Sequence, residues 1–322
     1  MTEEALSVFP RGWFAVCFSD EIPVGGTRQV RYFGQDMAAY RGEDGVVRIL
    51  DAYCAHMGAH LAAGGKVEGN SLRCPFHLWR YGPDGRCDDI PYAKKIPEKA
   101  CQKVWRAREV NGVVLVHHDA AGNAPDFEIP VIPEYGADDW LPWHTSMYHI
   151  KTHPREIVDN LADRAHFPAV HATKIEDFGF EIDGHTATQR VKGIAYLSGG
   201  GEDHFSSQTT YHGPGYLLMH MDGALQNYML FTHTPVDENH LDLRLALTLK
   251  IVGNREKTEG FVKQYMENLR RGFEDDIRIW ENKIYRDPPL LCDGDGPIGR
   301  LRRWYKQFYT MQAGKPAPVA CG

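Results

Sequence analysis

The sequence predicts an α+β chain in which an N-terminal all-β domain precedes a domain of antiparallel sheet and helices. Short apolar runs punctuated by Gly, Pro and Asp fill residues 10–118. A stretch rich in Ala, Gly, Pro and Asp follows at 119–142, and a long helical pattern comes after several further strand-like runs. We therefore expect two domains, at 1–125 and 126–322.

The first domain is predicted to consist of short strands, because its apolar runs are rich in β-branched and aromatic residues and end at turn residues. These strands are expected at 13–18, 27–33, 46–50, 103–109 and 112–117. The strands of the second domain are expected at 145–151, 186–196, 205–212, 215–221, 226–234 and 241–252. Its helices are expected at 154–166 and 257–285.

Composition narrows the class of protein. Of the 322 residues, 43% are hydrophobic and 25% charged, as in an ordinary globular protein. The net charge of −7 argues against nucleic acid or an anionic membrane surface as a partner. No apolar run has the length of a membrane-spanning helix, and the acidic start MTEEALSVFPRGW differs from a signal peptide, so we expect a cytoplasmic protein.

Two of the seven cysteines are each followed closely by a histidine. Cys54 and His56 form a Cys-x-His motif, and Cys74 and His77 form a Cys-x-x-His motif after an interval of 17 residues. Two thiolates and two imidazoles are the ligand set of a Rieske [2Fe–2S] cluster, with the cysteines on one iron and the histidines on the other.

The same four ligands could instead hold zinc in a tetrahedron. The paired order of the two motifs favours the cluster, as do Gly58 and Pro75, which are placed to shape two tight loops between short strands. Imidazoles in place of two thiolates make such a cluster less anionic, which raises its reduction potential above that of an all-cysteine cluster.

A second group of polar residues lies at 155–171, REIVDNLADRAHFPAVH. Asn160 and Asp163 are candidate catalytic residues here, and His166 and His171 are candidate metal ligands. Asp163 and His166 are three residues apart, so they would share one face of a helix.

His166 and His171 are five residues apart, which is about 140° around an ideal helix. A regular helix could not direct both rings at one ion. Pro168 lies between them, and we expect it to break the helix and let the rings converge.

Two histidines need a carboxylate to complete the facial triad that leaves iron positions open for O2. Asp276 falls within the apolar stripe of the predicted C-terminal helix, whereas Asp275 lies outside it. An error of one residue in the phase of this helix would exchange the two. Metal ligation would offset the cost of burying the carboxylate. The stripe consists of Val262, Met266, Leu269, Phe273, Trp280 and Ile284.

These motifs, in this order, resemble the Rieske-type ring-hydroxylating oxygenases over nearly the whole chain. The flanking segments resemble the steroid-acting branch, which contains the oxygenase component of 3-ketosteroid 9α-hydroxylase and the cholesterol 7-desaturases. The matching stretches are DAYCAHMG (51–58), CPFHLWRYGPDGRC (74–87), IPYAKKIP (90–97), REIVDNLADRAHF (155–167), IRIWENKIYRDPPLL (277–291) and LRRWYKQFY (301–309).

The resemblance implies metal ligands at the positions of this sequence that match the motifs of the family. The implied cluster ligands are Cys54, His56, Cys74 and His77, and the implied ligands of the mononuclear Fe(2+) are His166, His171 and Asp276. Asp163 matches the acidic residue that joins an iron-ligand histidine to a cluster histidine of the neighbouring subunit, which implies a head-to-tail homotrimer. From the residues alone, Asp163 could instead simply orient the His166 ring.

The implied activity is that of a terminal oxygenase that hydroxylates a C–H bond with O2. Its electrons would come from a separate NAD(P)H-dependent ferredoxin-type reductase or a ferredoxin, because the chain has no flavin or nicotinamide motif. Desaturation and O- or N-demethylation remain alternatives with the same iron. A Rieske ferredoxin, a pure electron carrier, is an alternative of another class, and it would leave the second domain without a role.

The expected substrate is a large, apolar, polycyclic, steroid-like molecule with one or two oxygen atoms. This expected substrate class follows from the resemblance to the steroid-acting branch. The segment 168–182, however, differs from that branch. Aromatic residues of the second domain could line its pocket or simply form sheet core. These residues are Phe178, Phe180, Tyr216, Tyr228 and Phe231.

Overall fold

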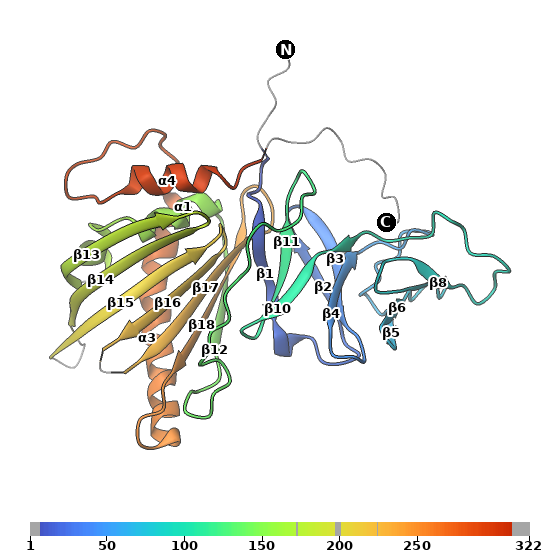
Figure 1. Cartoon of the computed structure of the whole chain (residues 1–322), viewed down its shortest axis with the longest axis horizontal. Helices are drawn as coiled ribbons and strands as arrows, with labels where there is room; N and C mark the ends of the chain where they lie inside the picture. Colours follow the sequence, from blue (N-terminus) through green and yellow to red (C-terminus); the bar gives the residue numbers. More distant parts are fainter. Residues whose placement is uncertain (1–6, 172, 197–200, 224, 311–322) are drawn as a thin grey trace, which may run out of the picture. The chain divides into compact units, whose positions relative to one another are not determined.

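The computed structural model describes residues 7–171, 173–196, 201–223 and 225–310. The chain divides into two compact units (Figure 1). Among the described residues, the first unit contains residues 7–125, Val236–Glu238 and Thr310. The second contains Asp126–Pro235 and Asn239–Tyr309.

In its described residues, the first unit contains three antiparallel sheets. One sheet has the order β1 (Gly12–Phe18), β11 (Val113–His118), β10 (Ala107–Val110). The next has the order β2 (Thr27–Tyr32), β3 (Gln35–Arg41), β4 (Val47–Asp51), β9 (Val104–Trp105). The third has the order β5 (Lys66–Glu68), β6 (Ser71–Arg73), β7 (Arg80–Tyr81), β8 (Cys87–Asp89). A 3-10 turn, η1 (Ser19–Glu21), follows β1.

The described residues of the second unit form an antiparallel sheet of seven strands. Its order is β12 (His144–Ile150), β18 (Leu241–Leu249), β17 (Asn227–Pro235), β16 (Tyr216–Asp222), β15 (Glu202–His212), β14 (Thr186–Tyr196), β13 (Thr173–Asp183). Each strand pairs with its neighbour in the sheet, and side chains alternate between the two faces.

Helices pack against this sheet (Figure 1). They are α1 (Pro154–Val158), η2 (Asp159–Leu161), α2 (His166–Val170), α3 (Arg255–Asn282) and α4 (Ile298–Lys306). The long helix α3 begins after Asn254, whose side-chain oxygen accepts hydrogen bonds from two free backbone N–H groups of the first turn. Its buried residues Val262, Met266 and Trp280 join the leucines of β18 in the main core.

The predicted α+β fold class is confirmed, with several differences in the elements. The run 103–109 forms two strands rather than one, and the runs that form β3, β5 to β8, β13 and α4 were not predicted. The edge strand β13 escaped notice because charged residues interrupt its apolar alternation and a bulge between Ile175 and Asp177 shifts it. The continuous helix expected at 154–166 is wrong, because helical structure stops after Leu161 and resumes at His166.

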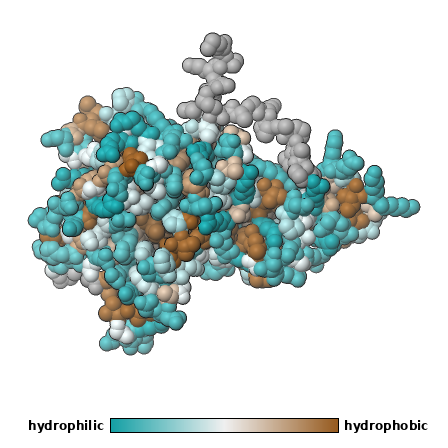
Figure 2. Space-filling model, viewed as in Figure 1, coloured by the Kyte–Doolittle hydropathy of each residue, from teal (hydrophilic) through white to brown (hydrophobic). Residues whose placement is uncertain are grey.

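The surface is mainly hydrophilic on the face shown in Figure 2, where hydrophobic residues form scattered patches. No helix in the described ranges is long and apolar enough to cross a membrane.

Candidate metal centres and pocket

Two loops of the first unit carry the predicted cluster ligands. Cys54 and His56 lie between β4 and β5, and Cys74 and His77 lie between β6 and β7. In the first loop, Gly58 has a φ of +75°, and its N–H donates to the Cys54 carbonyl over 2.9 Å. Glycine adopts this left-handed conformation without steric cost, so the chain can turn tightly here.

The two thiols lie in the interior. Cys54 and Cys74 are 4% and 1% exposed, and both belong to the core cluster beneath the loops. The Tyr81 hydroxyl lies 3.1 Å from Cys54 Sγ. Burial raises the pKa of the Cys54 thiol, so a cation beside the sulfur is needed to make thiolate favourable there.

The two imidazoles lie together and are less buried than the thiols. The ring centroids of His56 and His77 are 4.6 Å apart, and Trp79 stacks on His56 at 4.5 Å with an interplanar angle of 6°. His56 Nδ1 is buried, and no hydrogen-bond partner for it lies in the described part of the chain. A buried polar atom of this kind is costly unless something satisfies it. Two buried thiols and two adjacent imidazoles therefore fit a [2Fe–2S] cluster of the Rieske type.

In the second unit, the predicted iron-ligand segment is a broken helix. After α1 and η2 the chain leaves helical hydrogen bonding, and α2 then begins at His166. The expectation that Pro168 breaks the helix is wrong. Pro168 lies in the first turn of α2, where a proline costs little because the N–H it lacks would have no helical partner. The break lies before His166, and His171 caps the other end of α2.

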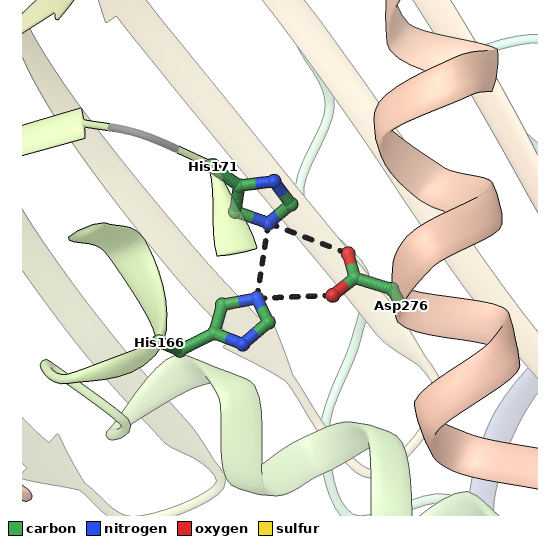
Figure 3. A group of neighbouring side chains, drawn as sticks. All are labelled: His166, His171 and Asp276. Carbon is green, nitrogen blue, oxygen red and sulfur yellow. Dashed lines mark hydrogen bonds and ion pairs between the residues drawn. The ribbon is translucent and has the colours of Figure 1, made fainter. Parts of the chain in front are cut away.

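The structure brings His166, His171 and Asp276 together (Figure 3). The His166 and His171 Nε2 atoms are 3.0 Å apart. Asp276 approaches from α3, with Oδ1 3.0 Å from His166 Nε2 and Oδ2 3.4 Å from His171 Nε2. Asp276 is only 3% exposed, whereas the Asp275 side chain is 54% exposed and pairs with Arg278. The helix phase therefore selects Asp276 over Asp275.

This arrangement fits a divalent metal ion. Two imidazole nitrogens that face each other at 3.0 Å compete for one proton, whereas both can donate lone pairs to a cation. Metal–ligand bonds of about 2.1 Å at right angles separate neighbouring ligand atoms by about 3 Å. Burial opposes ionisation of Asp276, but its interactions with His166 and His171 outweigh burial and lower the pKa of the carboxyl. Two histidines and one carboxylate are the facial triad of non-haem iron.

The two candidate catalytic residues lie beside the triad. Asn160 Nδ2 is 3.4 Å from His166 Nε2, and its amide oxygen accepts a hydrogen bond from Trp280 Nε1 over 3.5 Å. Asp163 Oδ1 accepts a hydrogen bond from the backbone N–H of His166 over 3.1 Å. Burial raises the pKa of Asp163.

The triad opens into a cavity of about 130 Å³. Three groups of residues line it: the metal triad with Asn160, apolar residues from the sheet and helices, and polar residues of the sheet. The apolar lining is Ile157, Leu161, Phe167, Leu217, Met219, Phe231, Leu243, Phe273 and Trp280, and the polar lining is Gln189, Thr209, Tyr211 and His233.

Of the five aromatic residues weighed as pocket lining or sheet core, Phe231 lines the pocket. Tyr216 and Tyr228 have the opposite parity on their strands from the lining residues, so they belong to the other face of the sheet. Phe178 and Phe180 lie on the edge strand β13. The polar lining residues were not predicted. The alternation of side chains along a strand shows which residues share a face of the sheet, but it does not show which face the helices cover.

An ion-pair network also escaped sequence reasoning. The guanidinium of Arg302, on α4, bonds both carboxylate oxygens of Asp159, with distances of 3.0 Å to Oδ1 and 2.6 Å to Oδ2. Lys283 Nζ lies 3.0 Å from Glu156 and 3.9 Å from Asp159. The network ties α4 and the end of α3 to the segment immediately before Asn160.

Comparison with known proteins agrees with both centres. Residues 12–102 match the Rieske [2Fe-2S] domain family, and residues 116–309 match the 3-Ketosteroid 9alpha-hydroxylase C-terminal domain family. The chain is similar to the 3-ketosteroid-9-alpha-monooxygenase oxygenase component of Rhodococcus rhodochrous, with 37% identity over 94% of this chain and 82% of the relative. It is also 33% identical to cholesterol 7-desaturase nvd 1 of Ciona intestinalis, over 94% of this chain and 69% of the relative.

Among solved structures, dicamba monooxygenase bound to dicamba shares the fold, with a TM-score of 0.77 at 16% identity over 94% of this chain and 98% of that one. A Rieske domain joined to a sheet-and-helix domain that carries a His–His–Asp cluster defines the class of Rieske non-haem iron oxygenases. Within that class, the chain belongs to the family of 3-ketosteroid 9α-monooxygenase oxygenase components.

Family membership decides between the interpretations that the sequence left open for each unit. The Rieske match sets zinc aside as the occupant of the Cys/His loops. The match of the second unit to an oxygenase domain sets aside the pure electron carrier.

Proposed function

We propose that this chain is the oxygenase that hydroxylates an unactivated C–H bond of a polycyclic, steroid-like substrate. The observation that carries the proposal is the opening of the His166, His171 and Asp276 cluster into a largely apolar cavity. The names of two relatives, a 3-ketosteroid monooxygenase component and a cholesterol desaturase, support the substrate class. The overall reaction consumes substrate R–H, O2, two electrons and two protons, and it yields R–OH and water.

In this proposal each metal has defined ligands. Cys54, His56, Cys74 and His77 hold the cluster in the domain at 1–125. His166, His171 and Asp276 hold the mononuclear iron in the domain at 126–322. When bound, the iron supplies O2 activation and the cluster supplies electrons.

The chain's own residues supply position and a dry environment. Phe231, Phe273 and Leu217 present apolar surface to the cavity, which excludes water from the bound substrate. Trp280 donates to the Asn160 amide oxygen, so the Asn160 NH2 group points toward His166 and the triad. We propose that Asn160 is a catalytic residue that donates hydrogen bonds beside the metal.

The cavity is smaller than most ligand pockets, which measure roughly 300 Å³ or more. A polycyclic substrate must therefore displace side chains on entry. Met219 and Leu217 are suited to this, because a methionine in particular changes rotamer at low cost.

The electrons come from a separate reductase, since family membership makes this chain an oxygenase component. We propose an NAD(P)H-dependent ferredoxin-type reductase or a ferredoxin as the partner. The loops that carry the cluster ligands expose Met57, Phe76 and Leu78, which are 66%, 59% and 48% exposed. Exposed apolar side chains next to a redox centre favour a transient protein contact there.

We also propose a head-to-tail homotrimer in which Asp163 links His166 to His77 of a neighbouring subunit. Asp163 is half-buried, and one of its carboxylate oxygens accepts from the His166 backbone.

Turnover with a substrate panel tests the proposed function. The purified enzyme, with a reductase and NADH, is incubated with steroids, methoxybenzoates and carnitine-like amines. A hydroxylated steroid is the expected product, with one oxygen atom from 18O2. A desaturated steroid would show that the enzyme desaturates its substrate rather than hydroxylating it. Desaturation is the activity that the name of the Ciona relative gives. Product from the aromatic acids or amines alone would overturn the substrate class.

A further inference from the structure

One backbone position in the second ligand loop, residues 74–79, is strained. Leu78, between His77 and Trp79, has a φ of +62°. A bulky L-residue is unfavourable in this left-handed conformation, because its Cβ approaches the following carbonyl oxygen. Among the described residues, Phe33 and Asn111 are the other non-glycine residues with a positive φ. Phe33 is fixed in the core and asparagine tolerates the conformation, whereas Leu78 is 48% exposed, so side-chain packing does not hold its backbone.

The backbone of Leu78 is held through its carbonyl group instead. Arg73 Nη1 donates to the Leu78 carbonyl oxygen over 2.6 Å and to Asp89 Oδ2 over 2.9 Å. The Nε and Nη2 atoms of Arg73 each donate to a carboxylate oxygen of Glu68 over 2.6 Å. The Arg73 side chain is only 13% exposed. Carboxylates on β5 and β8 thus fix a planar guanidinium, which in turn fixes the loop.

The strained residue lies within the stretch that positions the proposed cluster ligands. The Cys74 N–H donates to the Trp79 carbonyl over 2.8 Å, which closes the loop at its base. His77 directly precedes Leu78 in the chain. The Trp79 ring, which directly follows Leu78, stacks on the His56 ring of the first loop. A change in the backbone of Leu78 would therefore displace His77 directly and His56 through the stacked Trp79.

We propose that Arg73 is a positioning residue for the cluster. By binding the Leu78 carbonyl, it holds the left-handed turn that positions His77 and, through Trp79, the ring of His56. The geometry of the guanidinium matters here more than its charge. Lysine would keep the charge, but its donors all lie on one nitrogen, so it cannot reproduce the fork. This inference rests on the cluster ligands of the proposed function.

The rate of cluster loss tests the inference. The oxidised holoprotein is mixed with an excess of an iron chelator, and the decay of the visible cluster absorption is followed. The loop must open locally before the cluster can leave. Arg73→Lys leaves the strain at Leu78 without its restraint, so cluster loss should become roughly 5- to 30-fold faster. The electron paramagnetic resonance spectrum of the reduced cluster should also broaden, because the imidazole orientations vary.

Leu78→Gly separates positioning from simple stabilisation, because glycine adopts a φ of +62° without strain. In the Leu78→Gly background, Arg73→Lys should change the rate of cluster loss by less than about 2-fold. The matched control is Arg80→Lys. Arg80 lies on β7 and likewise contacts two carboxylates, at 2.6 Å from Asp88 and 3.6 Å from Glu68, so its variant should keep the wild-type rate.

If Arg73→Lys does not fold, as judged by circular dichroism, Glu68→Gln takes its place, because it loosens the guanidinium without removing it. Cluster loss should again be faster, and Leu78→Gly should again restore it. A wild-type rate in the variant used would overturn the inference. Faster loss that Leu78→Gly does not restore would also overturn it, because Arg73 would then act only on the strands. A wild-type holoprotein without a Rieske spectrum would instead overturn the proposed ligands.

Discussion

Oδ1 of Asp276 lies 3.0 Å from Nε2 of His166, although the two residues are carried by different helices, α3 and α2. Replacing Asp276 with Ala removes one of three ligands and should empty the mononuclear site while the cluster spectrum persists. Iron analysis should fall from three irons per chain to two, because the cluster itself holds two. The control Asp275→Ala changes the exposed neighbour and should keep all three. Loss of iron from the control alone would refute the helix phase.

His77→Ala should abolish the visible spectrum of the cluster, because the second iron would lose one of its two imidazoles. The mononuclear iron should remain bound, since its proposed ligands belong to the other unit. Optical and electron paramagnetic resonance spectra, with iron analysis, measure both effects. An unchanged cluster spectrum would show that His77 is not a ligand.

Asp163→Asn separates two roles for that residue. The asparagine oxygen can still accept from the His166 backbone N–H, so the local structure should persist. If Asp163 bridges subunits, both metals should load and the reductase should still reduce the cluster, while turnover nearly stops. A simple orienting role would lower iron affinity and activity together, by about 10-fold or more. Light scattering should show a trimer, and a monomer with normal turnover would exclude the bridge.

Arg302→Leu should destabilise the second unit by about 3–5 kcal/mol, because it leaves the buried carboxylate of Asp159 without its main partner. Urea unfolding measured by circular dichroism checks the loss. The neighbouring Arg303 is exposed, so Arg303→Leu should change stability by less than about 0.5 kcal/mol. Equal stability of the two variants would show that the ion pair contributes little.

Lowering the pH below neutral should decrease the free energy of unfolding of the protein. Burial lowers the pKa of His118 and of His212 to about 4, and that of His233 to about 3. As pH falls below the usual histidine value of about 6.5, the unfolded chain binds protons that the native chain does not, so stability decreases. Each histidine contributes up to about 1.4 kcal/mol per pH unit until the pH reaches its native pKa.

Thermal unfolding midpoints at pH 7, 6 and 5 measure this dependence. His212→Gln should make the decline shallower, because one titrating group is removed. The control His204→Gln lies on the same strand with a side chain that is 67% exposed, and it should keep the wild-type decline. A midpoint that does not change between pH 7 and 5 would contradict the argument.

Local sequence patterns were sufficient to predict the features that depend on residues close together in the chain. The Cys54 and Cys74 motifs specify a cluster because two ligands within three or four residues fit on one tight loop. The apolar stripe of α3 selects Asp276 over its neighbour because helical periodicity is local. The strands of the large sheet are likewise visible in the alternation of apolar residues, except where charges and a bulge interrupt the alternation in β13.

Contacts between side chains that are distant in the sequence depend on how the elements pack in three dimensions. Strand alternation places Phe231 and Tyr228 on opposite faces, but the packing of α3 and α2 against one face decides that Phe231 lines the pocket. The hydrogen-bonded pair of Tyr211 and His233 joins two strands that are not adjacent in the sheet, so no spacing in the sequence predicts it. Local patterns record the periodicity of single elements, whereas a pocket forms where the faces of several elements pack together.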